Sequence, residues 1–186
     1  MIRILFCNIS YLPYYNTRLD RVAPKNGGAY VAKMHDAYEK HNFEECADGQ
    51  YRGFVETKYR IGYEEGIATY NSLHIERIDP FAKGKTYLDD VLVVFCAKPE
   101  NGQTVIVGWY KNATVFRRRP FYNGRFFNIQ ADRKDGFLLP EDQRTFVVPR
   151  ARQDGIGFGQ ANIWYAGTPE CSEYVNKVIR YIESHA

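Results

Sequence analysis

Residues 90–97 (DVLVVFCA) and 104–109 (TVIVGW) are two apolar runs of strand length, and a short polar segment separates them. That segment, residues 99–102 (PENG), combines Pro, Asn and Gly, which is typical of a hairpin turn. Both runs are rich in Val and aromatic residues, which favour β-strands. We therefore predict a central β-hairpin, and residues 113–117 (ATVFR) continue its second strand or begin the next one.

Strand-like segments are spread over the rest of the chain. Residues 2–9 (IRILFCNI) predict a buried first strand. Further strands are predicted at residues 51–57, 73–79, 125–131 and 145–148. Because the predicted strands are short and numerous, the pattern favours a small twisted barrel of mixed strands.

Helical patterns are fewer. Residues 29–43 carry apolar residues near helical spacing and predict a short helix. Residues 170–185 predict an amphipathic C-terminal helix, because Val178 and Ile182 belong to one apolar face. No repeat or linker is evident in the 186 residues, so we expect a single α+β domain spanning residues 1–186.

Positive charge is concentrated in one part of the chain. The net charge is only +3, but no acidic residue occurs between Lys111 and Ala131, where aromatic residues alternate with arginines. Arginine interleaved with aromatic residues suits phosphate contact and base stacking, and a solvated loop is the alternative. The residues predicted to contact phosphate are Lys111, Arg117, Arg118, Arg119, Arg125, Arg150 and Arg152.

A glycine-rich loop at residues 155–159 (GIGFG) leads into a strand-like segment. A dinucleotide-binding loop would lead into a helix, so we reject that interpretation. Gln160 and Asn162 follow, and each amide offers both a donor and an acceptor. Beside Trp164 these amides suit recognition of a base edge, and the alternative is a loop whose amides face water.

The adjacent Trp109 and Tyr110 carry a second prediction. In a strand, neighbouring side chains point to opposite faces, so one of these rings points to the core and the other to solvent or a pocket. For Trp109, a pocket and a core position are equally favoured by the sequence, and simple packing of both rings is the alternative.

Several classes of site are not supported by the sequence. The cysteines lie far apart without a CxxC pair, so we expect free thiols, no metal site and no cofactor; they are Cys7, Cys46, Cys96 and Cys171. No nucleophile motif accompanies the histidines, so no catalytic residues are predicted. The chain has no apolar run long enough to span a membrane and no signal peptide, so we expect a cytoplasmic protein without a membrane partner.

The order of these motifs resembles a bacterial domain of the PUA-like superfamily, which includes the EVE, ASCH and YTH domains. The resemblance covers nearly the whole chain. Its most specific motifs are residues 107–117 (VGWYKNATVFR) and 157–166 (GFGQANIWYA). Such domains precede HNH nuclease modules in modification-dependent (type IV) restriction enzymes, and they also occur alone.

The resemblance implies a small twisted β-barrel, flanked by helices, that takes up a flipped, modified base in an aromatic cage. The cage would consist of Trp109, Tyr110 and Trp164, with Tyr11 or Tyr14 from the first loop. The polar edges of the base would be read by Asn8, Asn26, Gln160 and Asn162. The chain contains no HNH residues, so nuclease activity would have to come from a separate module or partner.

We therefore expect a DNA-binding reader of 5-methylcytosine or a related base in double-stranded DNA, without catalytic activity of its own. An RNA-binding module of the same fold is the first alternative. A nucleotide or small-molecule enzyme is the second, and its acid–base candidates would be Glu76, Asp89, Asp90 and His74. A protein-interaction domain that uses the arginines to bind an acidic partner is the third.

Overall fold

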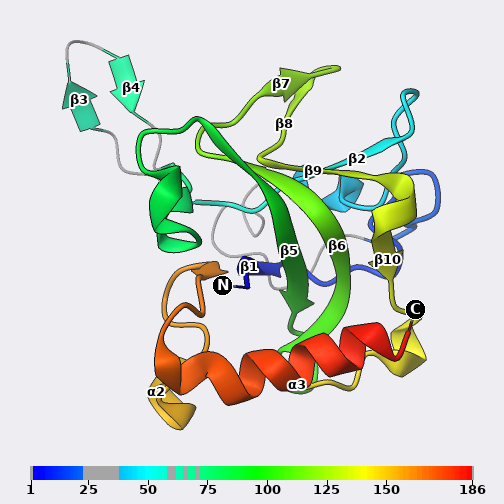
Figure 1. Ribbon diagram of the computed structural model, residues 1–186. Coiled ribbons are helices and arrows are strands. Elements are labelled where there is room, and N and C mark those ends of the chain that lie inside the picture. The colour runs from blue at the N-terminus through cyan, green and yellow to red at the C-terminus, as the bar shows by residue number, and fades with distance from the viewer. Residues whose placement is uncertain (1, 23–37, 58–61, 65–66, 70–71, 186) are drawn as a thin grey trace.

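A mixed β-sheet organises the computed structural model, which describes residues 2–22, 38–57, 62–64, 67–69 and 72–185 (Figure 1). The strand order is β11-β1-β5-β6-β9-β2, and β10 also pairs with β6. The seven strands are β1 (Ile4–Ile9), β2 (Gln50–Gly53), β5 (Tyr87–Ala97), β6 (Val105–Phe116), β9 (Ile129–Asp132), β10 (Gly136–Leu138) and β11 (Ile163–Trp164).

The predicted central hairpin is confirmed. Strands β5 and β6 pair in antiparallel fashion with Val94 opposite Trp109, and β6 continues through residues 113–116 as one long strand. The predicted first strand is also confirmed, and β1 lies parallel to β5 with Asn8 beside Cys96. On its other side β1 pairs with β11, so the glycine-rich region and the N-terminal strand are neighbours in the sheet.

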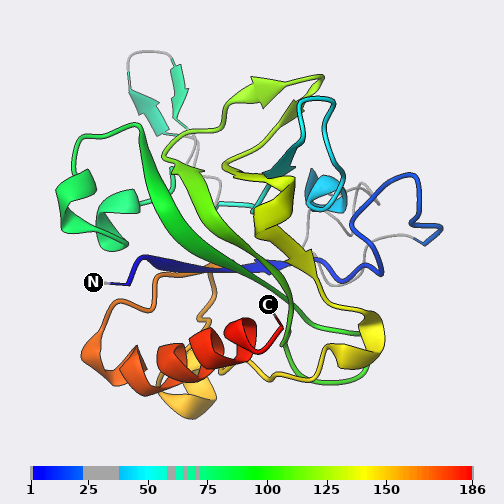
Figure 2. The same cartoon turned by 45° about the vertical axis from the view of Figure 1, so that its right-hand side comes forward.

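Both faces of the sheet are covered. The C-terminal helix α3 (Ser172–Glu183) crosses one face and buries Val175, Val178 and Ile182 there, which confirms the predicted amphipathic helix (Figure 2). Successive side chains of a strand point to opposite faces. In β1, Phe6 therefore joins the core under α3, and Leu5 joins the core on the other face.

Two small hairpins project away from helix α3 (Figure 1). One consists of β3 (Gly62–Glu64) and β4 (Ile67–Thr69), and the other of β7 (Phe121–Tyr122) and β8 (Arg125–Phe126). The remaining elements are short: 3-10 helices η1 (Tyr38–His41), η2 (Ile75–Arg77), η3 (Pro80–Ala82), η4 (Arg133–Asp135), η5 (Glu141–Gln143) and η6 (Pro169–Cys171), and helix α2 (Ala151–Asp154).

The architecture is therefore α+β, with a sheet-dominated core and few helices. In the part of the chain that the structure describes, the strand order ends at β11 and β2, and the pairings do not show a closed barrel. No described helix has the length and apolar character needed to cross a membrane. The four cysteines are free thiols, as predicted.

The strand predicted at residues 73–79 is wrong, because this segment forms the 3-10 helix η2. Ile75 and Ile78 are both buried, and their spacing of three residues fits a 3-10 turn. Asp79 then caps the next turn, since its side chain accepts a hydrogen bond from the backbone N–H of Phe81 at 2.9 Å. The helix predicted at residues 29–43 lies largely outside the described residues; of its described part, residues 38–43, only η1 (Tyr38–His41) is helical.

The strand predicted at residues 51–57 ends early, at Gly53. Side chains replace the neighbouring strand beyond that point. Asn42 exchanges two hydrogen bonds with the backbone of Phe54, and Asn128 exchanges two with the backbone of Val55, at distances between 2.8 and 3.1 Å. These four bonds hold the segment after β2 in a fixed path.

Two other predicted strands differ in extent. Residues 125–131 are divided between β8 and β9, because the chain leaves the projecting hairpin and enters the main sheet there. Residues 145–148 form no strand, and their contribution to the sheet is a single bridge between Val147 and Val105.

Candidate functional site

Asn8 and Asn162 meet where β1 and β11 leave their paired region, although they are 154 residues apart in the chain. The backbone N–H of Asn8 donates to the carbonyl oxygen of Asn162 at 2.7 Å, which extends the strand pairing by one step. Their side chains face each other, with 3.5 Å between Nδ2 of Asn8 and Oδ1 of Asn162. We call these two residues the amide pair; both were predicted to read a base edge.

The amide pair has spare hydrogen-bonding capacity. Within the described residues, Oδ1 of Asn8 is buried and has no hydrogen-bond partner. Nδ2 of Asn162 lies 3.4 Å from the carbonyl oxygen of Glu56. A buried acceptor without a partner costs about 1–3 kcal/mol. A ligand that donates a hydrogen bond to Asn8 would recover part of that cost.

Glu56 is held in place from the side of the projecting hairpin. Nη2 of Arg119 lies 2.5 Å from Oε1 of Glu56 and donates to Oγ1 of Thr57 at 2.7 Å. The same guanidinium lies over the ring of Phe54, 5.0 Å from its centroid. Arg119 therefore ties the chain before β7 to the segment that contacts the amide pair.

A buried carboxyl group contacts the chain just beyond the amide pair. Ser10, two residues after Asn8, donates from its hydroxyl to Oε2 of Glu39 at 3.2 Å. Burial raises the pKa of Glu39 from 4.5 to about 8, and repulsion from Glu56 also raises it, whereas the bond from Ser10 lowers it. At neutral pH the Glu39 carboxyl is therefore mostly protonated and can donate a hydrogen bond.

The five residues Asn8, Ser10, Glu39, Glu56 and Asn162 are called the polar cluster below. It combines amide donors and acceptors, a hydroxyl, a neutral carboxyl and a carboxylate within one region at the end of β1. Mixed donors and acceptors of this kind suit a polar, planar ligand edge better than they suit a metal ion.

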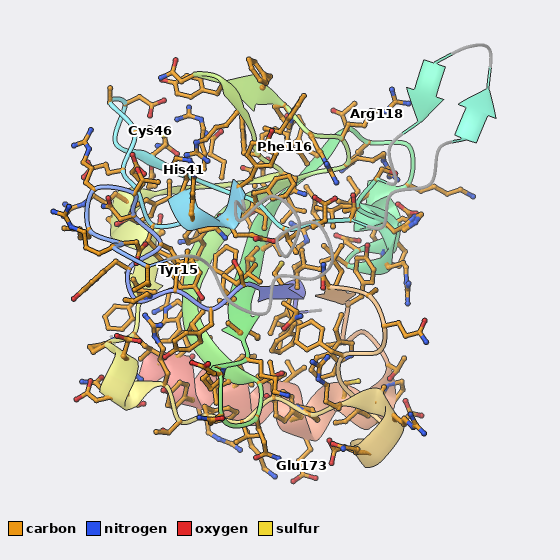
Figure 3. The ribbon with its side chains drawn as sticks, turned by 180° about the vertical axis from the view of Figure 1, so that it is seen from behind. Tyr15, His41, Cys46, Phe116, Arg118 and Glu173 are labelled. Atoms are coloured by element: carbon orange, nitrogen blue, oxygen red, sulfur yellow. The ribbon has the colours of Figure 1, made fainter. Side chains whose placement is uncertain are left out.

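The chain that follows β1 is firmly positioned. The hydroxyl of Tyr15 donates to the carbonyl oxygen of Ser10 at 2.8 Å. The buried guanidinium of Arg144 donates to the carbonyl oxygens of Leu12 and Pro13. Figure 3 shows Tyr15 and His41 on the side of the molecule away from Glu173 of helix α3.

The predicted cage of Trp109, Tyr110 and Trp164 does not form. Trp109 is 2% exposed and lies in the core under α3, stacked on Phe137 with 4.9 Å between ring centroids. Tyr110 points to the opposite face, where it is fully buried and its hydroxyl donates to the carbonyl oxygen of Asn42. Both faces of β6 are part of the core at this position, so Trp109 and Tyr110 cannot line one pocket together.

Trp164 differs from Trp109 because it lies near the amide pair. It is half-buried, follows Asn162 by two residues, and is stacked on Phe6 with 4.6 Å between ring centroids. Phe6 is two residues before Asn8, so the two aromatic rings and the amide pair form consecutive rows across β1 and β11. One face of the indole is therefore already used in packing.

The other predicted base-pocket residues are dispersed. Tyr11 is half-buried beside Arg144, 5.3 Å from ring centroid to guanidinium carbon. Tyr14 and Gln160 are exposed, and no described hydrogen bond joins Gln160 to the amide pair. Asn26 lies outside the described residues.

Three of the arginines predicted to contact phosphate instead hold the protein together, because carbonyl and carboxylate oxygens surround them. Arg117 donates to the carbonyl oxygens of Lys85 and Ala82 and pairs with Glu76 at 2.6 Å. Arg119 binds Glu56, as described above, and Arg125 donates to the carbonyl oxygen of Arg52 at 2.8 Å.

Among the remaining predicted phosphate contacts, Arg118 and Arg152 are exposed, and Lys111 and Arg150 are half-buried. The exposed pair leaves two cations on the surface for an anionic partner.

None of the four acid–base candidates named from the sequence belongs to the polar cluster. Glu76 pairs with Arg117 and lies 3.1 Å from the imidazole of His74. Asp89 accepts a hydrogen bond from Thr114, and Asp90 is exposed. Among the described residues, no group of three or more His, Cys, Asp or Glu side chains is arranged to hold a metal ion.

The sequence reasoning missed Ser10, Glu39 and Glu56. Ser10 had a usable signal, since it directly follows a buried strand whose polar Asn8 faces the same side. Glu39 had none, because it lies in the polar segment of residues 38–41 (YEKH), where burial of the second residue cannot be inferred from spacing.

Comparison with known proteins found no matching family model, no matching curated protein and no matching solved structure.

Proposed function

We propose that this chain binds double-stranded DNA and reads a modified base, of the 5-methylcytosine class, at the amide pair. The observation that carries the proposal is the buried, unpartnered Oδ1 of Asn8 beside the amide of Asn162. Asn162 belongs to residues 157–166, one of the two motifs on which the resemblance to PUA-like domains mainly rests, and Asn8 lies in the strand that pairs with this motif. The PUA-like barrel and the separate nuclease module are part of the same proposal.

The polar cluster offers the hydrogen bonds that a flipped cytosine requires. The exocyclic amino group of cytosine donates a hydrogen bond, and Oδ1 of Asn8 can accept it. The ring nitrogen and carbonyl oxygen of cytosine are acceptors, which an amide N–H or the protonated carboxyl of Glu39 can satisfy. A base lacking the matching groups would leave buried polar atoms unpaired, which is the physical basis of discrimination.

Affinity and recognition come from different residues in this proposal. Arg118 and Arg152 are exposed and contribute salt-dependent attraction to the phosphate backbone. The polar cluster contributes the choice of base. Substitution of these arginines should therefore change the affinity for DNA but not the choice of base, and substitution in the polar cluster should change the choice of base.

The test is a binding titration by fluorescence anisotropy at two salt concentrations. The probes are duplexes carrying cytosine, 5-methylcytosine, 5-hydroxymethylcytosine or N6-methyladenine at one position, with a matched RNA as competitor. We expect wild-type protein to prefer one modified duplex. Asn8→Ala and Asn162→Ala should reduce that preference by about 1–3 kcal/mol, roughly 5- to 150-fold. Gln160→Ala is the matched control and should keep the preference.

Two results would overturn the proposal. Wild-type protein that binds all four duplexes equally does not read a base. Wild-type protein that binds the RNA more tightly than every duplex is an RNA-binding module, because the 2′-hydroxyl is then the recognised group.

Glu39 supports a second candidate function, an enzyme acting on a nucleotide. A buried carboxyl whose pKa is about 8 has the property of a general acid or base that works near neutral pH. This function predicts turnover of a nucleoside or nucleotide by the purified protein and loss of turnover in Glu39→Gln. Wild-type protein that binds such a compound without converting it would exclude this second function.

A further inference from the structure

The projecting β7–β8 hairpin presents two aromatic rings to solvent. Phe121 is 63% exposed and Phe126 is 36% exposed, and the two face each other across the hairpin with 5.1 Å between ring centroids. Exposure of an apolar ring to water costs free energy, so two such rings side by side on one projection are a candidate contact surface.

The opposite face of the hairpin is fixed to the body of the protein. The guanidinium of Arg52 lies 3.8 Å from the ring centroid of Tyr122. Arg125 donates to the carbonyl oxygen of Arg52 at 2.8 Å. Tyr122 and Arg125 are cross-strand partners, so one face of the hairpin is bound to β2 and the other face carries the phenylalanines.

The tip and the base of the hairpin are also well defined. Asn123 and Gly124 at the tip have φ values of 45° and 80°, as a tight two-residue hairpin turn requires. At the base, the N–H of Phe127 donates to the carbonyl oxygen of Pro120 at 3.1 Å. The rings of Phe121 and Phe126 are therefore held in position before any partner arrives, which lowers the entropy lost on binding.

Arg119 connects the hairpin to the polar cluster. It directly precedes Pro120 and binds Glu56, whose carbonyl oxygen is contacted by Asn162. The exposed phenylalanines and the amide pair thus belong to one connected region. Arg117 and Arg119 of this region are paired with Glu76 and Glu56, whereas Arg118 is exposed beside the hairpin and supplies a cation for an anionic partner.

We propose that Phe121 and Phe126 form a wedge that inserts into the base stack of duplex DNA and fills the gap left by the base that is read. The inference rests on the proposed function and specifies how the duplex is opened. Apolar side chains that enter a base step unstack it, and aromatic rings replace part of the lost stacking. The exposed cation of Arg118 and the paired rings of Phe121 and Phe126 together favour a nucleic acid over a protein partner.

The test compares a duplex with a single strand. The duplex carries the modified base that wild-type protein prefers, and the single strand is its modified strand alone. The variant is Phe121→Ala with Phe126→Ala, and the matched control is Phe81→Ala, whose ring is 87% exposed on η3. We expect the double variant to bind the duplex about 10- to 100-fold more weakly and the single strand nearly as well as wild-type protein.

A fluorescent base analogue beside the modified base gives a second readout. 2-Aminopurine placed beside the modified base should fluoresce more strongly when wild-type protein binds, because the base stack is opened there. The same duplex saturated with the double variant should show no such rise in fluorescence. Phe81→Ala should behave as wild-type protein in both assays. Thermal unfolding followed by circular dichroism shows whether each variant is folded.

The outcomes separate the wedge from the proposed function. Unchanged duplex binding and fluorescence in the double variant would overturn the wedge and leave base reading intact. Equal losses on duplex and single strand would also overturn it, because the phenylalanines would then be a simple stacking platform. If wild-type protein shows no preference for a modified base but its duplex binding still depends on the phenylalanines, base reading and the filling of its gap are overturned, and only insertion of the rings into the duplex remains. No binding to either probe would overturn both.

Discussion

Nη1 of Arg144 donates a hydrogen bond to the carbonyl oxygen of Leu12 across 2.7 Å. The same guanidinium donates to the carbonyl oxygens of Pro13 at 2.5 Å and Leu139 at 2.9 Å. One buried cation therefore joins the segment after β1 to the segment after β10. Because Ser10 of the polar cluster lies two residues before Leu12, this contact also positions the chain that follows the candidate site.

Arg144→Met should destabilise the fold strongly. Methionine fills similar space but donates no hydrogen bonds, so three carbonyl oxygens would lose a charged donor. We expect the free energy of unfolding to fall by about 2–4 kcal/mol, measured by urea denaturation. The exposed Arg152→Met should change it by less than about 0.5 kcal/mol. Equal stabilities of the two variants would show that the Arg144 bonds contribute nothing net.

The raised pKa of Glu39 predicts a specific dependence of stability on pH. In the folded protein Glu39 keeps its proton up to about pH 8, whereas the unfolded chain releases it near the ordinary pKa of 4.5. The folded state therefore binds the extra proton between these pH values, and stability falls as pH rises through this window. Above about pH 8 the contribution of Glu39 no longer changes.

Comparison of wild-type protein with Glu39→Gln isolates this effect. Glutamine resembles the protonated carboxyl and does not titrate. The difference in unfolding free energy between the two proteins should shift in favour of the variant by up to about 1.4 kcal/mol per pH unit within the window. Urea denaturation at pH 5, 6, 7 and 8 measures it. Parallel curves for the two proteins would mean that Glu39 titrates normally in the folded state.

Two substitutions of Trp109 distinguish a structural role of this residue from a role in binding. Because its indole is packed under α3, Trp109→Ala should lower the free energy of unfolding by about 3–5 kcal/mol. Trp109→Phe keeps an aromatic ring on Phe137 and should fold. Its preference for a modified duplex should equal that of wild-type protein in the anisotropy titration. Loss of preference in a fully stable Trp109→Phe would instead restore Trp109 to the binding site.

The parts of the fold that the sequence predicted are those with a strong local apolar pattern. Strand β1 and the β5–β6 hairpin are apolar runs of strand length, α3 repeats apolar residues at helical spacing, and each of these elements occurs in the structure. The segment after β2 was less accessible to such reasoning, because the amides of Asn42 and Asn128 take the place of a strand there.

The candidate site was predictable only in part. The amides of Asn8 and Asn162 were recognised, and the pairing of β1 with β11 brings them together. The aromatic cage failed because alternation in β6 places Trp109 and Tyr110 in two different cores. The burial of Glu39 depends on contacts between segments distant in sequence, which no local pattern records.

Arg118 and Arg117 are neighbours in sequence, and their substitution should have different effects. Arg118 is exposed, so Arg118→Ala should weaken binding to every duplex alike and lower the slope of log affinity against log salt by about 1. Arg117 binds Glu76 and two carbonyl oxygens, so Arg117→Ala should instead destabilise the fold by about 2–3 kcal/mol. Titrations at several salt concentrations and urea denaturation of both variants measure these effects. A salt slope that Arg118→Ala leaves unchanged would mean that this side chain does not contact phosphate and that the anionic partner binds elsewhere on the surface.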